Sequence, residues 1–446
     1  MRRAYRGLRA RPPEPRYDAV VIGAGIGGLF CANLLAQAGA RVLLVEQHYQ
    51  VGGYCSTFRR RGFTFDAASH FYPLLGNGGS ITGKLLARLG IETGWVKMDP
   101  VDTFHFPDGS RFDVPADLET YRARLDADFP HEREALESFF QRVKDAYLRG
   151  LLCYFRGHDE SRLGDAGSLT LGEVLDRSFT DPKLKLLLTA DCPHWGSPPS
   201  RTSFVFDSML RLSYFLGNYY PEGGSQTFAD ALAHRFEQNG GHILMGTSAE
   251  RIEVERGRVR AVRLETVRGP RRGPARVKTE AVISNADLRL TLDRLLEPGD
   301  VDPGYRRSID ALRPSFPCFL SHLGVEGVDS RDLERVQGYY WRSWDAESVG
   351  RDGLRCKIFV PTLYEPRMAP PGSHVIILQK VLEMDYDAVE DWRAHKQSVE
   401  RACLEHLESV LPGIRERIVV KNSASARTSW RFTLNRAGAM LGWEMS

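Results

Sequence analysis

Four glycines stand within six positions of the chain, directly after an unbroken run of apolar residues. They are Gly23, Gly25, Gly27 and Gly28 in the segment "VVIGAGIGGL". A turn without side chains lets a phosphate group approach the backbone, and a helix that starts there offers it unpaired N–H groups and a positive dipole end. The alternative is a flexible turn that binds no ligand. The elements on either side of the glycines distinguish between these two interpretations.

The residues around these glycines predict a strand, a turn, a helix and a second strand. "YDAVVIG" is typical of a buried parallel strand, residues 26–38 of a helix that Gly39 ends, and "RVLLVE" of a second buried strand. Glu46 closes the second strand, where a carboxylate can accept hydrogen bonds from both hydroxyls of an adenosine ribose. In this setting the glycine turn predicts a dinucleotide site.

A second glycine pair, Gly52 and Gly53, follows Glu46 by six residues and leads into a predicted strand pair. A domain that binds NAD would usually continue directly into another helix. A second surface made only of backbone suits a cofactor that extends past its pyrophosphate. The order of these segments therefore predicts FAD rather than NAD.

Several segments resemble one family. "DAVVIGAGIGGL", "VLLVEQH", "GGYCSTF" and "GFTFD" look like the N-terminus of the phytoene desaturase, carotenoid isomerase and retinol saturase group of FAD-dependent oxidoreductases. Residues 219–287, with a Pro-x-Gly-Gly turn and the ending "AVISNAD", and the segment "RTSWRFTLNRAGAMLGWE" resemble later parts of the same group.

This resemblance implies a role for each residue of the first glycine turn. Gly23, Gly25 and Gly28 would lie around the pyrophosphate, with Gly27 in the same turn. Glu46 would bind the ribose.

The resemblance also implies cofactor contacts beyond the first turn. Gly52, Gly53 and Ser56 would line the path to the ribityl chain, and the backbone of Ala249 would contact the adenine. Tyr54, also expected at the cofactor, stands where related flavoproteins often carry an arginine that contacts phosphate.

The implied fold is α/β, with a Rossmann-like FAD-binding domain of the glutathione-reductase/amine-oxidase type in discontinuous segments and an inserted α+β substrate domain. Relatives continue with a strand, a glycine-rich turn and a helix facing the flavin, so the chain is expected to be C-terminally truncated at Ser446 and to lack the last FAD motif. The expected segments are a disordered basic leader (1–16), the FAD-binding domain (17–75, 219–300 and 421–446) and the substrate domain (76–218 and 301–420).

Few other residues suggest chemistry. His70 lies in "FDAASHF", a segment that approaches the flavin in the family, and it is either a proton relay or a structural histidine. Cys55 has a redox role or is simply packed, and Asp66 is expected to cap a turn. His48, His70 and His194 have no ligand spacing, so no metal site is predicted.

Charge and composition limit the partners. The net charge of +3 comes from six arginines within residues 1–16, which gives no sign of nucleic-acid binding. Seven scattered cysteines without a C-x-x-C pair indicate reduced thiols and a cytoplasmic protein. No apolar stretch is long enough to cross a bilayer. The oligomeric state is left open.

Residues 137–157 combine aromatic and leucine side chains with arginine and lysine. This mixture is typical of a helix at a membrane surface, where a lipophilic substrate would be collected. An ordinary helix packed on the substrate domain is the alternative. The sequence therefore predicts peripheral membrane contact as one of two interpretations.

The family implies an FAD-dependent oxidoreductase that desaturates, saturates or isomerises the carbon–carbon double bonds of a lipophilic polyene or isoprenoid. No residue stands out as an acid or a base, which suits a reaction performed mostly by the cofactor. The alternatives are an enzyme like the flavin amine oxidases, and a truncated protein that keeps the FAD fold without catalysis.

Overall fold

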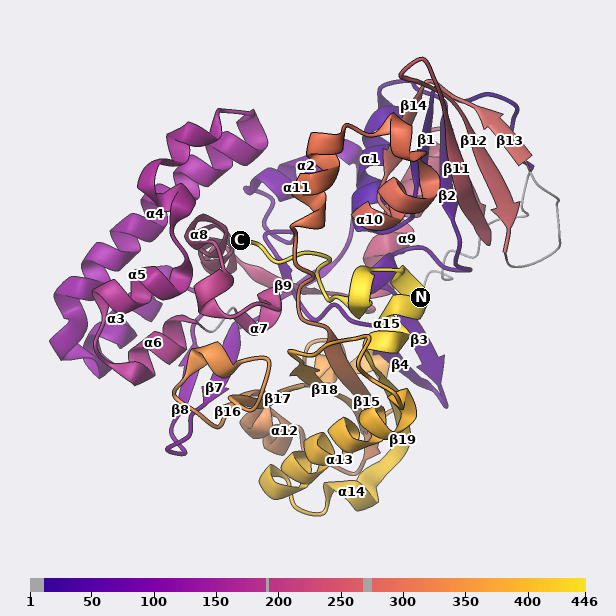
Figure 1. The fold of residues 1–446 in the computed structure, drawn as a ribbon. Coiled ribbons are helices and arrows are strands. Elements are labelled where there is room, and N and C mark those ends of the chain that lie inside the picture. The colour runs from indigo at the N-terminus through magenta and orange to yellow at the C-terminus, as the bar shows by residue number, and fades with distance from the viewer. Residues whose placement is uncertain (1–11, 190–191, 268–274) are drawn as a thin grey trace.

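A four-stranded parallel sheet is built from three distant parts of the chain (upper right in Figure 1). The computed structural model describes residues 12–189, 192–267 and 275–446. The sheet has the strand order β10 (His242–Met245), β2 (Val42–Glu46), β1 (Ala19–Ile22) and β14 (Ala281–Ser284). Every residue of β1 is buried, as expected for a parallel strand that is covered on both faces.

Helices cover one face of this sheet and a second sheet covers the other. Val21 and Leu44 pack with Leu29 of α1 (Ile26–Gln37) and Phe228 of α9 (Ser225–Gln238). On the opposite face lies an antiparallel sheet of β11 (Thr247–Glu255), β12 (Arg258–Thr266) and β13 (Ala275–Lys278). These layers confirm the predicted α/β class with a Rossmann-like sheet in discontinuous segments.

A larger, mostly antiparallel sheet forms the lower part of the molecule (Figure 1). One face carries an apolar core shared with α12 (Ser330–Val336), α13 (Trp392–Val410) and α14 (Ile414–Arg417). Only β16 and β7 pair in parallel among its strands. In order the strands are β19 (Ile418–Ala424), β15 (Cys318–Glu326), β18 (Ser373–Val381), β17 (Leu354–Phe359), β16 (Gly338–Trp341), β7 (Asp102–His105) and β8 (Arg111–Val114).

A helical lobe lies beside the edge of this sheet that β7 and β8 form (left in Figure 1). The long helix α4 packs on α8 through buried side chains such as Phe139, Val143 and Phe204. The lobe comprises α3 (Leu118–Asp128), α4 (Arg133–Arg156), α5 (Leu171–Ser178), α6 (Pro182–Leu188), α7 (Cys192–Trp195) and α8 (Phe204–Phe215).

Short elements join these parts. They are the hairpin β3 (Thr57–Arg60) and β4 (Phe63–Asp66), the sheet β5 (Tyr72–Pro73), β9 (Asn218–Pro221) and β6 (Trp95–Lys97), and the helices α2 (Ile81–Leu89), α10 (Leu288–Leu290), α11 (Pro303–Asp310) and α15 (Ala426–Thr433).

The last part of the expected leader, residues 12–16, lies within the described part of the structure and contacts a sheet. Residues 1–11 lie outside the described part, but Arg16 forms a β-bridge with Lys278 and an ion pair with Glu280 at 2.8 Å. The carbonyl of Pro15 accepts a hydrogen bond from the Lys278 backbone at 2.9 Å. Pro15 and Arg16 therefore contact the edge strand β13, and the expected disordered leader remains a prediction.

The expected domain division remains a prediction. Strand β19 pairs with β15 and spans the boundary placed between residues 420 and 421. Strands β7 and β8, within the segment 76–218, join the same large sheet as the later segment 301–420. No helix among the described residues combines the length and the apolar character that a membrane span requires.

Candidate functional site

A cavity of about 690 Å³ opens at the carboxyl ends of β1, β2 and β14 and extends to β15, β19 and α15. Ligands of open α/β sheets bind at this end of the strands. Eight of the ten residues predicted to contact a cofactor line the cavity: Gly23, Gly25, Glu46, Gly52, Gly53, Tyr54, Ser56 and Ala249. The structure thus brings these residues together, and their individual contacts with a cofactor remain predictions.

The first glycine turn shows why Gly27 and Gly28 are absent from the cavity wall. A Cβ on Gly28 would lie 2.1 Å from the carbonyl oxygen of Gly23, and one on Gly27 would lie 2.7 Å from the side-chain oxygen of Asn285. These two glycines permit close packing of the helix. Gly23 adopts a φ of +95°, which favours glycine, and Gly25 is the N-cap of α1.

Glu46 ties the second strand to the glycine turn while it faces the cavity. Its Oε2 accepts the backbone N–H of Ala24 at 2.8 Å, and its Oε1 accepts that of His48 at 2.8 Å. Burial raises the pKa of the Glu46 carboxyl, while the backbone hydrogen bonds act in the opposite direction. Each carboxylate oxygen can accept a further hydrogen bond, so ribose hydroxyls can still be bound.

The two glycine segments form one continuous surface of backbone. Gly52 donates its N–H to the carbonyl of Ala24 at 2.8 Å and forms a β-bridge with Gly25. Gly52 and Gly53 have φ values of +113° and +58°, both in the region that favours glycine. A Cβ on Gly53 would lie 3.3 Å from the Cα of Gly25. A Cβ on Gly52 would lie 2.7 Å from the carbonyl oxygen of Cys55, so the close approach of the two turns requires glycine.

Tyr54 connects this surface to the last segment of the chain. Its hydroxyl donates a hydrogen bond to the carbonyl of Ala439 at 2.9 Å and accepts one from the Asn435 amide at 3.3 Å. Burial raises the pKa of Tyr54, so the phenol is neutral at pH 7. The tyrosine therefore has no charge to replace the arginine that related flavoproteins carry.

Cys55 also lies on the cavity wall, with its Sγ 3.3 Å from the Ser69 hydroxyl. Burial raises the pKa of the Cys55 thiol, which disfavours the reactive thiolate. This environment supports the interpretation of Cys55 as a packed residue.

His70 lies behind the cavity wall, with a side chain that is almost fully buried. Its ring stacks on Phe359 at a centroid distance of 5.1 Å. Burial and the charge of Lys357 lower its pKa to about 3, so the imidazole is neutral at pH 7. Neither ring nitrogen has a hydrogen-bond partner among the described residues. A proton relay at His70 remains a prediction, and it would have to use the neutral ring.

Asp66 caps a helix far from it in sequence. Its Oδ1 accepts the backbone N–H of Ser225, the first residue of α9, at 2.9 Å, and its Oδ2 accepts the hydroxyl of Tyr220. This contact joins β4 to α9, whereas the predicted role was to cap the turn that follows Asp66.

Sequence reasoning did not single out two polar residues of the cavity wall, Asn285 and His322. Asn285 directly follows β14, just as Glu46 ends β2, so its place at a strand end was a usable signal. His322 lies on β15, and its Nε2 is 2.9 Å from the carbonyl oxygen of Asp66. Its Nδ1 has no partner within the described part of the chain.

The cavity fits a flavin dinucleotide. Its volume lies within the range of sites for ligands of this kind, and both glycine turns present backbone where phosphates would approach. Glu46 suits the ribose, and the Nδ1 atom of His322 can bond a polar edge of a ring. No three His, Cys, Asp or Glu side chains of residues 12–189, 192–267 and 275–446 are grouped as a metal site requires.

Relatives with established names share most of the chain. Prolycopene isomerase 2 of an Oncidium hybrid cultivar is 27% identical, over 95% of this chain and 74% of the relative. All-trans-retinol 13,14-reductase of Danio rerio is 24% identical, over 98% of this chain and 79% of the relative. Carotenoid 3,4-desaturase of Haloarcula japonica is 27% identical, over 86% of this chain and 79% of the relative.

Solved structures share the fold. A crystal structure of an oxidoreductase from Methanosarcina mazei matches with a TM-score of 0.66 at 18% identity, over 91% of this chain and 87% of that one. The family described as flavin containing amine oxidoreductase matches residues 26–442. The chain therefore belongs to the flavin containing amine oxidoreductase family and is an FAD-dependent oxidoreductase.

Proposed function

We propose that the protein acts on the carbon–carbon double bonds of a lipophilic polyene or isoprenoid, by desaturation, saturation or cis–trans isomerisation. The observation that carries this proposal is that an isomerase, a reductase and a desaturase, all named for a carotenoid or a retinoid, align with 86–98% of this chain. Their reactions differ in outcome and share a conjugated chain of double bonds.

The chemistry of the cavity wall supports this substrate class. When bound, FAD supplies hydride transfer in either direction. The wall beyond the glycine turns offers Cys55, Leu320 and Met440, with the neutral side chain of His322 among them. Burial lowers the pKa of His322 to about 4, so no cationic acid acts from this position at pH 7. These side chains can contact an apolar substrate, and they stand beside polar ones such as Asn422 and Thr433.

Purified protein loaded with FAD tests the proposal directly. We expect flavin absorbance in the protein fraction, and products of a carotenoid or retinoid that differ from the substrate by two hydrogens or only in double-bond geometry. The mass and the retention time of the product separate desaturase, saturase and isomerase. Unchanged polyenes together with hydrogen peroxide release from small amines would favour the amine oxidase alternative. Absence of flavin binding would favour the non-catalytic one.

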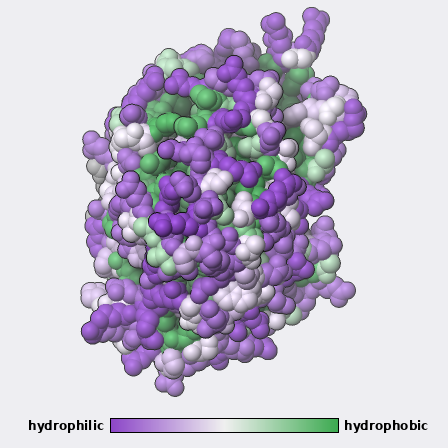
Figure 2. Space-filling model, turned by 90° about the vertical axis from the view of Figure 1, so that its left-hand side faces the viewer, coloured by the Kyte–Doolittle hydropathy of each residue, from purple (hydrophilic) through white to green (hydrophobic). Residues whose placement is uncertain are grey.

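We also propose that the C-terminal half of α4 meets a membrane surface and collects the substrate there. Leu148, Leu152 and Phe155 are 52%, 44% and 60% exposed and follow one another along one side of the helix. Arg149 and Arg156 are exposed on the adjoining side. Figure 2 shows apolar side chains gathered in the upper part of the face that the helical lobe presents. Apolar side chains beside arginines suit an anionic lipid surface.

Sedimentation with lipid vesicles tests this contact. We expect binding to vesicles that contain anionic lipid, and at least tenfold weaker binding after the double substitution Leu152→Ser and Phe155→Ser. Val419→Ser, at an exposed position of β19 in the lower part of Figure 1, is the matched control. Equal binding by all three proteins would contradict the proposal. The cysteines are free, which is typical of a reducing compartment. This supports a membrane contact on the cytoplasmic side.

A further inference from the structure

A row of side chains crosses the large sheet from the cavity described above to a second, smaller one. In register, Leu320 lies opposite Gln379, Gln379 opposite Lys357, Lys357 opposite Tyr339, and Tyr339 opposite Phe104. Leu320 lines the large cavity and Phe104 lines the small one. Since residues directly opposite each other point to the same face, the row connects the two cavities across five strands.

Lys357 occupies the middle of this row and is only 3% exposed. Its Nζ donates a hydrogen bond to Asp102 Oδ2 at 2.8 Å and another to the Tyr339 hydroxyl at 3.2 Å. A buried ion pair contributes little net stability, because both charges lose their hydration. Buried ionisable groups of this kind beside a cavity are candidates for function.

Hydrogen bonds continue from Tyr339 away from the large cavity. The Tyr339 hydroxyl bonds to Nε2 of His194, and Nδ1 of His194 lies 3.0 Å from the Tyr214 hydroxyl. Burial and the charge of Lys357 lower the pKa of His194 to about 3, so its ring is neutral and has one donor and one acceptor nitrogen. An ammonium, a phenol, a neutral imidazole and a second phenol can each give one proton while accepting another.

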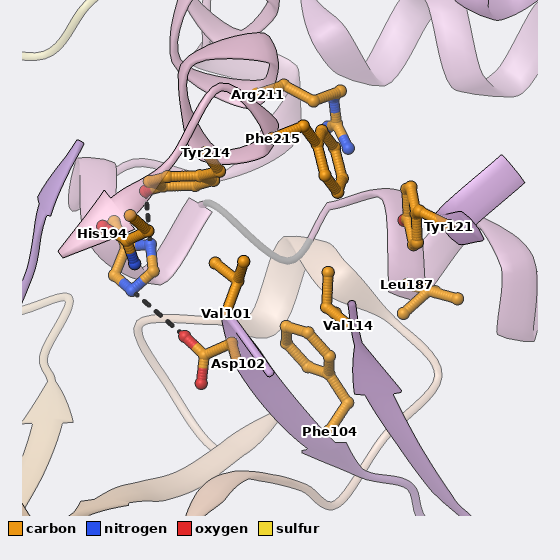
Figure 3. A pocket seen from close by; sticks show the side chains of 11 residues that line it. Val101, Asp102, Phe104, Val114, Tyr121, Leu187, His194, Arg211, Tyr214 and Phe215 are labelled. Carbon is orange, nitrogen blue, oxygen red and sulfur yellow. Dashed lines mark hydrogen bonds and ion pairs between the residues drawn. The ribbon is translucent and has the colours of Figure 1, made fainter. Parts of the chain in front are cut away.

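The small cavity lies at the far end of this chain of groups. Its volume of about 30 Å³ has room for one or two water molecules. Figure 3 shows His194 between Tyr214 and Asp102 on one wall, with mostly apolar side chains and Arg211 around the rest. Asn218 also lines the cavity and is 1% exposed, and its Oδ1 has no partner among the described residues. A buried acceptor requires a donor, which water provides.

At the near end, Gln379 lies between Lys357 and the wall of the large cavity. Its Nε2 donates to the sulfur of Met440 at 3.7 Å, and Met440 lines that cavity. Its Oε1 is buried and has no hydrogen-bond partner within the described ranges. A water molecule can satisfy a buried acceptor of this kind.

We propose that Lys357, Tyr339, His194 and Tyr214 form a proton relay that serves the double-bond chemistry of the large cavity, with water at both ends. This relay rests on the proposed function. Lys357 is a positioning residue here, since it acts through water beside Gln379.

The proton balance follows from the reaction. Saturation of a double bond would require a hydride at one carbon, which reduced FAD would supply when bound, and a proton at the other. The π electron pair forms the bond to the incoming proton, while water beside Gln379 gives that proton and regains one from Lys357. Tyr339 then reprotonates Lys357 and takes a proton from His194. His194 regains its proton from Tyr214, and Tyr214 regains its own from water in the small cavity, where solvent replaces the proton that was consumed. Desaturation runs the same transfers in reverse.

Two neighbouring tyrosines give a matched test. Tyr339→Phe removes the relay hydroxyl but keeps the ring, whereas Tyr340→Phe removes a hydroxyl that donates to the Val336 carbonyl at 2.8 Å. We expect Tyr339→Phe to lower the rate of saturation or desaturation about 10- to 100-fold, within the range that proton transfer contributes. Tyr340→Phe should stay within about twofold of the wild type. Equal rates for both variants would overturn the relay.

Lys357→Arg separates a relay from a structural ion pair. Arginine keeps the positive charge beside Asp102 but does not release a proton. We expect Lys357→Arg to lose as much turnover as Lys357→Met. We also expect Lys357→Arg to retain flavin binding and the melting temperature of the wild type. Rescue of turnover by arginine would overturn the relay and leave the proposed function intact.

A readout without turnover completes the test. A high-resolution crystal structure of the FAD-loaded protein should show ordered water within hydrogen-bond distance of Asn218 Oδ1. A dry small cavity would overturn the relay. If the wild type holds flavin but leaves every polyene unchanged, the proposed function fails and the relay fails with it.

Discussion

At the scale of single residues, Gly25 and Gly28 serve different purposes within one turn. A Cβ on Gly28 would meet the backbone of Gly23 at 2.1 Å, whereas one on Gly25 would project into the cavity and meet only the Asn285 side chain at 3.1 Å. We therefore expect Gly28→Ala to lower the free energy of unfolding by about 1–3 kcal/mol. We expect Gly25→Val to abolish flavin retention, because its side chain would occupy the space of the pyrophosphate.

Urea unfolding and flavin absorbance of the purified variants measure the two effects. Gly299→Ala is the control, since a Cβ there meets nothing within 4 Å and its φ is not positive. Normal flavin content in Gly25→Val would show that the pyrophosphate lies elsewhere. Unchanged stability of Gly28→Ala would show that the turn relaxes without cost.

At the scale of elements, the N-terminus of α9 depends on a carboxylate from β4. Asp66 accepts the Ser225 N–H and the Tyr220 hydroxyl in a fully buried setting. Asp66→Ala would leave the buried Ser225 N–H without an acceptor, would leave the Tyr220 hydroxyl only its contact with the Met368 sulfur at 2.9 Å, and would remove the carboxylate that joins β4 to α9. We expect it to lower the free energy of unfolding by about 2–4 kcal/mol, since a buried donor without a partner costs about 1–3 kcal/mol.

Asp117→Ala is the matched control, because Asp117 caps the exposed start of α3 by accepting the Thr120 N–H at 2.8 Å. An exposed cap is worth about 1 kcal/mol. Urea denaturation midpoints of both variants provide the comparison. A loss in Asp66→Ala no larger than in Asp117→Ala would mean that water replaces the lost carboxylate.

At the scale of the whole molecule, buried histidines make stability depend on pH. Burial lowers the pKa to about 3 for His70 and His194 and to about 4 for His322, against 6.5 for an unperturbed histidine. Between these values the unfolded chain binds more protons than the folded one, so stability falls as the pH drops below about 6.5. Each site contributes on the order of a few kcal/mol across that window.

Melting temperatures between pH 7.5 and 4.5 check this dependence. We expect a steady fall below pH 6.5, and a shallower fall in His70→Phe, which keeps the stack on Phe359 and removes the titrating ring. A His70→Phe slope equal to that of the wild type would exclude His70 as a contributor.

Local sequence patterns determined the nucleotide-binding half of the fold. The apolar runs before Gly23 and Glu46 became β1 and β2, and the helix between them begins at Ile26 as expected. A short, continuous apolar run indicates a strand that is buried on both faces. Both strands could therefore be predicted from the sequence itself. The glycines and Glu46 were predictable because they stand at strand ends, where the backbone path is already set.

Only the tertiary structure decided what lies across the large sheet. Strands β16 and β17 were not predicted, and Lys357 and Tyr339 drew no attention as single polar residues in sequence. Asp66 meets Ser225 across 159 positions, and Lys357 meets Asp102 across 255. The role of a buried polar group can be inferred only from its hydrogen-bond or ion-pair partner, or from the lack of such a partner. That partner depends on strand register and on how the helical lobe packs, which short-range patterns do not encode.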